Sequence, residues 1–421
     1  MSDERASLPA EGEAWELLEE RLKGLGKDDI DWRNQRTAVY VFHPGEDVLK
    51  VAKEAYAIYQ SENALGPAAF PSLKRMETDV IGMATRLMHG PADATGNMTS
   101  GGTESIILAT KSCRDAAEAK GMDVRGAKLV VPRTAHLAFD KAAHYLGLEI
   151  VRVEVTKDFL ADPDAMRDAI DERTIMLVGS APCFPYGLID PIPALGEIAA
   201  EHDLWFHVDA CVGGYLNPFA EMEGAELPPW DFRVDAVTSI SADLHKYGYA
   251  AKGASTVLHR SPTTYAFQLF QEDNWPAGGM TTPTVAGTRP GGAIASAWAV
   301  MHFLGEAGYR KRAKQMMDAR KKLTAGMEAL GLRVFGDPRL SLFSFGAVEG
   351  DDLPIFLVWK TMHDRGWFSG VVQDPAGIHL MLSPSHEKVA DDYLADLADA
   401  VRIARGEDVE QQSGEAPVRY A

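Results

Sequence analysis

Short apolar runs alternate with helical stretches through the middle of the chain. The runs are 128–132, 148–155, 174–182, 204–210, 236–243 and 254–260. Most are apolar throughout instead of alternating with polar residues, which is typical of strands whose sheet is covered by helices on both faces. The pattern therefore predicts an α/β fold with a large, mostly parallel sheet.

Helical patterns precede this region. Apolar residues recur at steps of three and four between 11 and 25, and this stripe consists of Trp15, Leu18, Leu22 and Leu25. It predicts an amphipathic helix whose apolar face needs a partner surface, which a second subunit could supply. Two more helices are predicted between 46 and 90, separated by a loop where Gly-Pro and Phe-Pro pairs interrupt the pattern.

A second, smaller unit follows the Gly- and Pro-rich stretch 281–292. A long helical pattern runs to about 330, and two short strands, a helix and a last strand are predicted at 332–335, 341–346, 352–365 and 378–383. The expected organisation is an N-terminal helical segment (1–50), a large domain (51–292), a small C-terminal α+β domain (293–405) and a tail (406–421).

Composition narrows the class of protein. Of 421 residues, 61 are acidic and 42 basic, so the net charge of −19 would repel nucleic acid and anionic membrane surfaces. No run is long and apolar enough for a membrane span, and charges interrupt the N-terminal residues where a secretory signal would be apolar. The three cysteines form no metal-binding or disulfide pattern, so we expect no metal and a reducing, cytoplasmic setting.

Two candidate groups for chemistry lie at the ends of predicted strands. The run TSGGTES (99–105) precedes an apolar helix, and its free backbone N–H groups could bind a phosphate, although the run taken alone is better explained as an ordinary helix cap. Asp209 ends the 204–210 run, where open α/β sheets place ligands. Its carboxylate could hold a heterocyclic nitrogen protonated or merely cap a loop.

Two further groups are rich in histidine and lysine. His136 follows the 128–132 run and could lie flat against an aromatic ligand or simply begin a helix. In SADLHKYGYAAKG, Lys246 stands in a crowded polar turn, where it could be an ordinary surface charge or, with its pKa lowered by neighbours, could form a Schiff base. Together, a phosphate-binding loop, a stacking ring, a counter-ion and a lysine are what pyridoxal 5′-phosphate requires.

The sequence resembles the sphingosine-1-phosphate lyases, which belong to the group II decarboxylase-like, fold-type I pyridoxal phosphate enzymes. The resemblance spans roughly 45–395 and is densest in FPSLKRMETDV, TSGGTESI, PRTAHLAFDKAA, GSAPCFPYGLIDPI, HVDACVGGYL, SISADLHKYGYAAKG and PTVAGTRPGG. It implies a fold-type I architecture, bound pyridoxal phosphate and a homodimer with a shared active site.

The resemblance also implies roles for individual residues. Lys246 would form the Schiff base, Asp209 would pair with the pyridine nitrogen, and His136 would stack on the ring. The residues implied near the cofactor phosphate are Gly101, Gly102 or Thr103 with His245, and Gly287 and Thr288 would reach it from the neighbouring subunit. Ser241 would be a further cofactor-binding residue. Those implied for the substrate are Asn63, Lys252 as a phosphate ligand, and Tyr249 or Lys246 for proton transfer.

The sequence departs from the lyase pattern at two places near the substrate. The lyases commonly have a His after Asn-Pro-Leu, whereas this chain reads Asn63-Ala64-Leu65-Gly66, and the Pro usual before the second lysine is Ala251. The expected reaction is retro-aldol cleavage of a small-molecule amine, for a lyase a phosphorylated sphingoid base, into an aldehyde and phosphoethanolamine. An amino-acid decarboxylase is the alternative, and a non-catalytic pyridoxal phosphate protein is a third.

Overall fold

The computed structural model describes residues 5–407, so the predicted tail from residue 408 onward lies outside the described residues. The helices are α1 (Trp15–Leu25), α2 (Glu46–Ile58), α3 (Pro71–Leu87), α4 (Gly102–Ala119), α5 (Ala138–Leu146), α6 (Pro163–Asp168), α7 (Ile192–Glu201), α8 (Asn217–Met222), α9 (Pro262–Ala266), α10 (Gly291–Ala329), α11 (Ile355–Asp364) and α12 (Ala390–Ala404). Short 3₁₀ helices are η1 (Gly26–Asp28), η2 (Trp32–Asn34) and η3 (Pro384–Lys388).

The strands form three sheets. The large sheet contains β1 (Thr95–Thr99), β2 (Lys128–Pro132), β3 (Glu149–Val153), β4 (Thr174–Ser180), β5 (Trp205–Asp209), β6 (Val237–Ala242) and β7 (Ser255–His259). The small sheet contains β10 (Leu332–Val334), β11 (Leu342–Ala347), β12 (Gly370–Gln373) and β13 (Ala376–Met381). A separate hairpin pairs β8 (Phe270–Glu272) with β9 (Met280–Thr282).

The large sheet confirms the predicted α/β fold. Its strand order is β1-β7-β6-β5-β4-β2-β3, and all six predicted strands are present within it. Pairing is parallel from β3 through β6, while β7 runs antiparallel to both of its neighbours. The carboxyl ends of the parallel strands therefore meet at one edge, where a ligand site is expected.

Two hydrophobic cores cover the two faces of the large sheet. Leu129 and Val131 of β2 pack in the core that α4 and α5 share, whereas Val130 between them packs in the core with α3, α7 and α10. Successive strand side chains point to opposite faces, so a strand buried on both faces must be apolar at every position. This packing explains why the predicted runs do not alternate.

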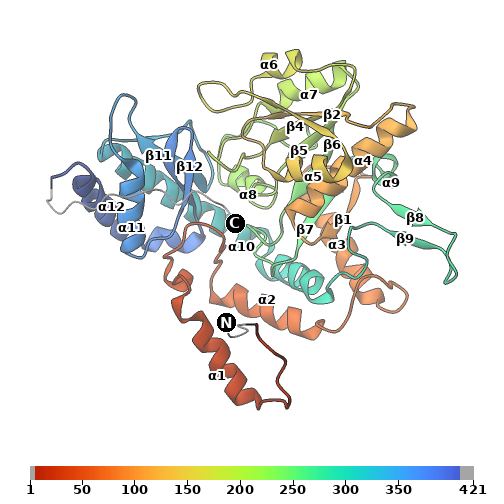
Figure 1. Ribbon diagram of the computed structural model, residues 1–421, viewed down its shortest axis with the longest axis horizontal. Helices are drawn as coiled ribbons and strands as arrows, with labels where there is room; N and C mark the ends of the chain where they lie inside the picture. The colour runs from red at the N-terminus through yellow and green to blue at the C-terminus, as the bar shows by residue number, and fades with distance from the viewer. Residues whose placement is uncertain (1–4, 408–421) are drawn as a thin grey trace.

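The small sheet has its own core against α11 and α12 (Figure 1). The 39-residue helix α10 joins the two regions, and its axis changes at Gly305, whose φ is 53° and ψ −177°. Ala38, from the N-terminal segment, also packs in the small core, and its N–H donates to the Phe368 carbonyl. The N-terminal segment is therefore partly built into the small region.

Four strands were not predicted from the sequence. β1 reads TGNMT, and β8 and β9 are short strands that are mostly exposed. β12, GVVQ, has one buried residue. These segments have no continuous apolar run that would predict a strand. Their strand conformation depends instead on pairing with a neighbouring strand, which for β1 is β7.

Candidate active site

A cavity of about 390 Å³ lies at the carboxyl edge of the parallel strands. The loops after β1, β2, β4, β5 and β6 converge there, as they do at ligand sites of open α/β sheets. The residues that line it are Ser100, Gly101, Gly102, Thr103, Glu104, Ile106, His136, Pro182, Phe184, Asp209, Cys211, Val212, Asp243, His245 and Lys246. Seven of the residues implied by the family resemblance therefore meet in one cavity.

Lys246 forms an ion pair inside this cavity. Its Nζ lies 3.1 Å from Oδ2 of Asp243, a carboxylate that is 3% exposed. Burial alone would lower the pKa of Lys246, but the charge of Asp243, with smaller contributions from Cys211 and Asp209, raises it above the ordinary value. Asp243 thus holds the amino group in place and keeps its proton on, an interaction that sequence reasoning missed.

Asp209 is fixed at the end of β5. Its Oδ1 accepts hydrogen bonds from the Cys211 N–H at 3.0 Å and the Ser241 hydroxyl at 3.3 Å. Both bonds go to the same oxygen, so Oδ2 can face a cationic ring nitrogen. Ser241 does not line the cavity, and its hydroxyl instead bridges Asp209 to His207 Nε2 at 3.2 Å. The structure therefore places Ser241 behind Asp209 as its support.

His136 also lines this cavity. Its Nδ1 accepts a hydrogen bond from the Ala138 N–H at 3.1 Å, which orients the ring at the start of α5. Burial lowers the pKa of His136, so its ring is neutral near pH 7. A neutral, oriented imidazole at the cavity wall is suited to stack on a flat heterocycle, and Phe184 packs edge-on to it at 6.4 Å between centroids.

The glycine-rich loop (99–103) approaches the strand ends closely. A Cβ on Gly102 would lie 2.6 Å from Cys211 Sγ and 2.9 Å from Asp243 Oδ2, so a larger residue would fill the space between α4 and β6. His245 Nδ1 and Asp243 Oδ1 are buried without a hydrogen-bond partner beside this loop. Buried polar atoms without partners are costly, and here they lie where a polar ligand would bind.

These residues fit pyridoxal phosphate. The backbone N–H groups at the start of α4 and His245 offer donors for a phosphate, Asp209 an acceptor for the ring nitrogen, and Lys246 an amine for the aldehyde. His136 supplies the flat wall. The hydrogen-bond donors and the buried polar atoms without partners therefore match the cofactor implied by the sequence.

Lys252 lies next to the cavity without lining it. Its Nζ donates to the carbonyls of Tyr40 at 3.1 Å and His245 at 3.4 Å and lies 5.0 Å from the centre of the Phe42 ring. Although Lys252 stays accessible to solvent, desolvation by the chain packed around it and the positive charge of Lys246 lower its pKa to about 8. It is a second cation within reach of an anionic substrate group.

Tyr249 is not brought to the cavity. Its side chain is buried in the core, where the hydroxyl lies 3.9 Å from Met316 Sδ and the ring stacks near Tyr309. Burial raises the pKa of Tyr249 well above its ordinary value. The φ of Tyr249 is 58°, and its side chain does not line the cavity, so the proton-transfer role of Tyr249 stays a prediction.

Asn63, Gly287 and Thr288 form a second group that does not line the cavity. The 284–289 segment carries Gly287 and Thr288, and Asn63 is bridged to the adjoining Pro290. The Asn63 Oδ1 accepts from the Leu65 N–H at 3.1 Å, and Thr288 is exposed. Asn63, Gly287 and Thr288 thus lie apart from the seven implied residues that meet in the cavity of this chain.

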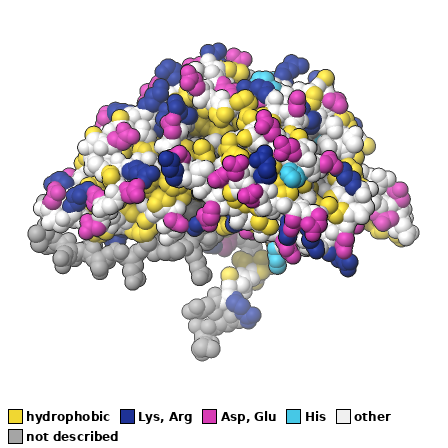
Figure 2. All heavy atoms as spheres, turned by 90° about the horizontal axis from the view of Figure 1, so that it is seen from above, with side chains coloured by type: hydrophobic (Ala, Val, Ile, Leu, Met, Phe, Trp, Pro, Cys, Tyr) yellow, Lys and Arg dark blue, Asp and Glu magenta, His cyan; other side chains and the backbone are white. Residues whose placement is uncertain are grey.

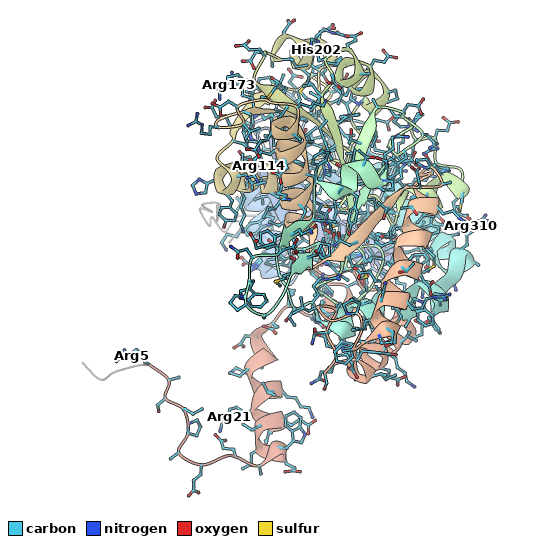
Figure 3. The ribbon with its side chains drawn as sticks, turned by 90° about the vertical axis from the view of Figure 1, so that its right-hand side faces the viewer. Arg5, Arg21, Arg114, Arg173, His202 and Arg310 are labelled. Carbon is cyan, nitrogen blue, oxygen red and sulfur yellow. The ribbon has the colours of Figure 1, made fainter. Side chains whose placement is uncertain are left out.

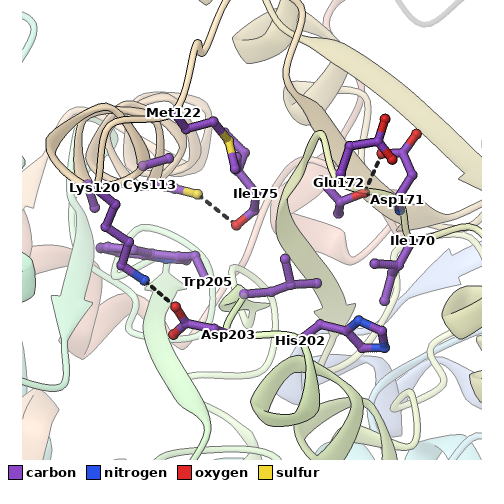
Figure 4. A pocket seen from close by; sticks show the side chains of 14 residues that line it. Cys113, Lys120, Met122, Ile170, Asp171, Glu172, Ile175, His202, Asp203 and Trp205 are labelled. Carbon is purple, nitrogen blue, oxygen red and sulfur yellow. Dashed lines mark hydrogen bonds and ion pairs between the residues drawn. The ribbon is translucent and has the colours of Figure 1, made fainter.

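A second cleft, of about 380 Å³, lies near the amino ends of β4 and β5 (Figure 4). Its lysine, Lys120, is paired with Asp203 at 2.7 Å, and the thiol of Cys113 donates to the Ile175 carbonyl. Burial raises the pKa of Cys113, so the thiol is not poised as a nucleophile. This cleft lacks the paired reactive groups of the first.

Within residues 5–407, no three His, Cys, Asp or Glu side chains are grouped to hold a metal ion. No helix among these residues is long and apolar enough to cross a membrane. The fold and the cavity together define a fold-type I pyridoxal phosphate enzyme.

Comparisons with known proteins agree with this class. Residues 5–345 match the pyridoxal-dependent decarboxylase conserved domain. The chain is 40% identical to sphingosine-1-phosphate lyase 1 of Rattus norvegicus over 94% of this chain and 69% of the relative, and 39% identical to the lyase of Arabidopsis thaliana over 98% and 76%. The structure of a Burkholderia pseudomallei sphingosine-1-phosphate lyase superposes with a TM-score of 0.91 at 36% identity, covering 96% of this chain and 94% of that one.

The chain therefore belongs to the pyridoxal-dependent decarboxylase family, on the branch of the sphingosine-1-phosphate lyases. It is a pyridoxal phosphate-dependent lyase. A Lactobacillus brevis glutamate decarboxylase shares the fold, with a TM-score of 0.82, at only 21% identity. The closer sequence identity to the lyases favours the lyase reaction over the decarboxylase alternative.

Proposed function

We propose that this enzyme cleaves a phosphorylated sphingoid base by a retro-aldol reaction. A base removes the proton of the β-hydroxyl group, the carbon–carbon bond to the amine-bearing carbon breaks, and the hydroxyl carbon leaves as an aldehyde. The amine-bearing fragment takes up a proton and leaves as phosphoethanolamine. The observation that carries the proposal is Lys252, a second cation beside Lys246, in a chain 34–40% identical to sphingosine-1-phosphate lyases from animals, a plant and yeast.

Each cavity residue has a defined task in this proposal. Pyridoxal phosphate, when bound, supplies a cationic ring that takes up the electrons released by bond breaking. Lys246 would hold its aldehyde, Asp209 would keep its ring nitrogen charged, and His136 would fix the plane of the ring. The Lys246 Nζ, held beside Asp243, would also be placed to take up or return a proton at the reacting carbon or oxygen of the substrate.

Lys252 would select the phosphorylated substrate. An enzyme with a net charge of −19 has little general attraction for an anion, so a dedicated cation must supply it. The Lys252 Nζ is positioned by two backbone carbonyls and retains a hydrogen to donate. An ammonium group in this position can bind a phosphate at the cavity mouth.

We also propose that the active site is completed in a homodimer. The 284–289 segment and Asn63 do not line the cavity of their own chain, and Thr288 is exposed. Helix α1 extends away from the rest of the chain (Figure 3), and Trp15 and Leu25 on it are 61% and 73% exposed. Both features would be buried by a second copy that receives Gly287 and Thr288 at its own cavity.

A product assay tests the reaction directly. The purified enzyme loaded with pyridoxal phosphate is incubated with a sphingoid-base phosphate, its dephosphorylated form and a panel of free amino acids. We expect aldehyde and phosphoethanolamine in equal amounts from the phosphorylated substrate and much slower turnover of the dephosphorylated form. Release of CO₂ from an amino acid, without aldehyde from the sphingoid phosphate, would replace the lyase with a decarboxylase.

A further inference from the structure

Glu104 is a buried carboxylate in the first turn of α4 with no assigned role. It is 7% exposed and lines the cavity. Its Oε2 accepts a hydrogen bond of 2.6 Å from the Ser100 N–H, in the glycine-rich loop. One oxygen of Glu104 therefore fixes the loop expected to bind the cofactor phosphate in the same chain.

The other oxygen of Glu104 holds a distant part of the sequence. Its Oε1 accepts from the Val285 N–H at 2.9 Å and from the Ala286 N–H at 3.4 Å. These residues begin the segment that carries Gly287 and Thr288. One side chain thus joins the glycine-rich loop to the 284–289 segment.

The far end of the 284–289 segment is fixed separately. Arg289 forms an ion pair with Glu77 of α3, and its Nη1 also donates to the Met98 carbonyl at 3.2 Å. Gly287 and Thr288 therefore lie between two anchored positions, with Glu104 on one side and Arg289 on the other. Only the Glu104 anchor also contacts the glycine-rich loop.

We propose that Glu104 is a positioning residue that couples the two active sites of the dimer, by joining the glycine-rich loop of one site to the segment that enters the other. This inference rests on the proposed homodimer and adds a regulatory link to it. A cofactor phosphate that orders the glycine-rich loop also fixes Glu104, and the fixed carboxylate orders Val285 and Ala286. Binding at one site then favours binding at the second.

Cofactor titration is the first test. Cofactor-free protein is titrated with pyridoxal phosphate while the visible absorbance of the lysine adduct is recorded. We expect a Hill coefficient above 1 for the unsubstituted protein and about 1 for Glu104→Gln, because an amide of the same size has one acceptor oxygen and cannot hold both loops. The matched control is Glu118→Gln, an exposed carboxylate on the same helix, which should keep the cooperativity.

Mixed dimers separate coupling from a local effect on one site. One subunit carries Lys246→Ala with Glu104→Gln, and the other is unsubstituted, so the adduct forms only where the subunit's own Glu104 is intact. The comparison dimer carries Lys246→Ala alone. Loss of charge-assisted bonds to backbone N–H groups should weaken adduct formation by about tenfold in the first dimer relative to the second. Equal affinities would overturn the proposal.

A second variant keeps the test decisive if Glu104→Gln does not fold. Val285→Pro removes the backbone N–H that makes the shorter of the two bonds to Glu104 Oε1 and leaves the sequence of the glycine-rich loop and Glu104 unchanged. In the same mixed dimer it should weaken the adduct at the opposite site, and unchanged affinity would contradict the coupling. A monomeric protein would also overturn the inference, whereas the product assay judges the lyase reaction independently of it.

Discussion

The cavity at the strand ends and the 284–289 segment differ in how each is held. Asp209, His136 and Lys246 are fixed by the large sheet and by buried hydrogen bonds or an ion pair. Gly287 and Thr288 belong to a surface segment attached to the body through Glu104 and Arg289. The first region is prearranged within one chain, while the second presents its residues outward.

In the proposed homodimer, this difference separates the residues that carry out the chemistry from those that would contact the second subunit. A group that must hold a proton or a charge benefits from burial, because a low dielectric strengthens its electrostatic interactions. A segment that completes a neighbouring site must stay accessible until the neighbour binds. On the face shown in Figure 2, acidic and basic side chains are interspersed. Because the cavity groups depend on these buried electrostatic interactions, we expect substitutions in the cavity to have the largest effects on activity.

Lys246→Ala should have the largest effect. Removing the only cavity lysine removes the covalent link to the cofactor, so the visible absorbance band should disappear and turnover should fall by several orders of magnitude. Borohydride reduction followed by mass spectrometry identifies the modified residue. Lys120→Ala, in the second cleft, is the matched control and should retain the trapped adduct. Trapping on a different lysine would refute the assignment of Lys246.

Asp209→Asn should follow in size and should affect chemistry more than binding. The amide preserves the shape that accepts from Cys211 and Ser241 but cannot keep a ring nitrogen protonated. We expect kcat to fall by about tenfold for each unit by which the pKa of the ring nitrogen drops, since one pKa unit corresponds to about 1.4 kcal/mol, with far less loss of cofactor. Parallel measurements of kcat and of bound cofactor test this prediction. Unchanged turnover would exclude a role for Asp209 in keeping the ring nitrogen protonated.

The cavity side of this comparison could be predicted from sequence, and the reason is geometric. Asp209 ends a strand that is buried along its whole length, and a parallel sheet gathers all such strand ends at one edge. The apolar pattern of this strand and the position of Asp209 at its end were therefore enough to predict where the site lies. The same reasoning did not locate Tyr249, because nothing in a Tyr three residues after Lys246 shows that its side chain packs in the core and not in the cavity.

The contacts that hold the second region could not be predicted. Glu104 and Val285 are far apart in the sequence, and their bond depends on how a surface segment folds back over α4. The ion pair of Asp243 with Lys246 was accessible in principle, because the two residues are three positions apart in one turn. Long-range contacts between loops leave no periodic signal, whereas strands and helices do.

Lys252→Ala should show an effect that depends on the substrate. Losing a charge-assisted hydrogen bond to a substrate phosphate costs about 1.5–3 kcal/mol, which lowers kcat/KM by about one to two orders of magnitude. Cofactor occupancy should hardly change, because Lys252 does not line the cavity. Steady-state assays with phosphorylated and dephosphorylated substrates show whether the loss of kcat/KM depends on the substrate phosphate. A variant that is kinetically silent with the phosphorylated substrate would remove Lys252 from substrate binding.

Asp243→Asn should give the smallest effect, seen in how fast the cofactor is captured. Lys246 must lose its proton before it can attack an aldehyde, and in the native chain the Asp243 charge outweighs burial and raises its pKa. Without that charge, burial dominates and the pKa falls, so more of the amine is neutral at pH 7. Stopped-flow mixing of cofactor-free protein with pyridoxal phosphate should then show several-fold faster adduct formation. Across a pH series, the pH at which the rate is half-maximal should be lower in Asp243→Asn than in the unsubstituted protein. Glu118→Gln should leave this midpoint unchanged. An unchanged midpoint in Asp243→Asn would mean that Asp243 does not control the charge of Lys246.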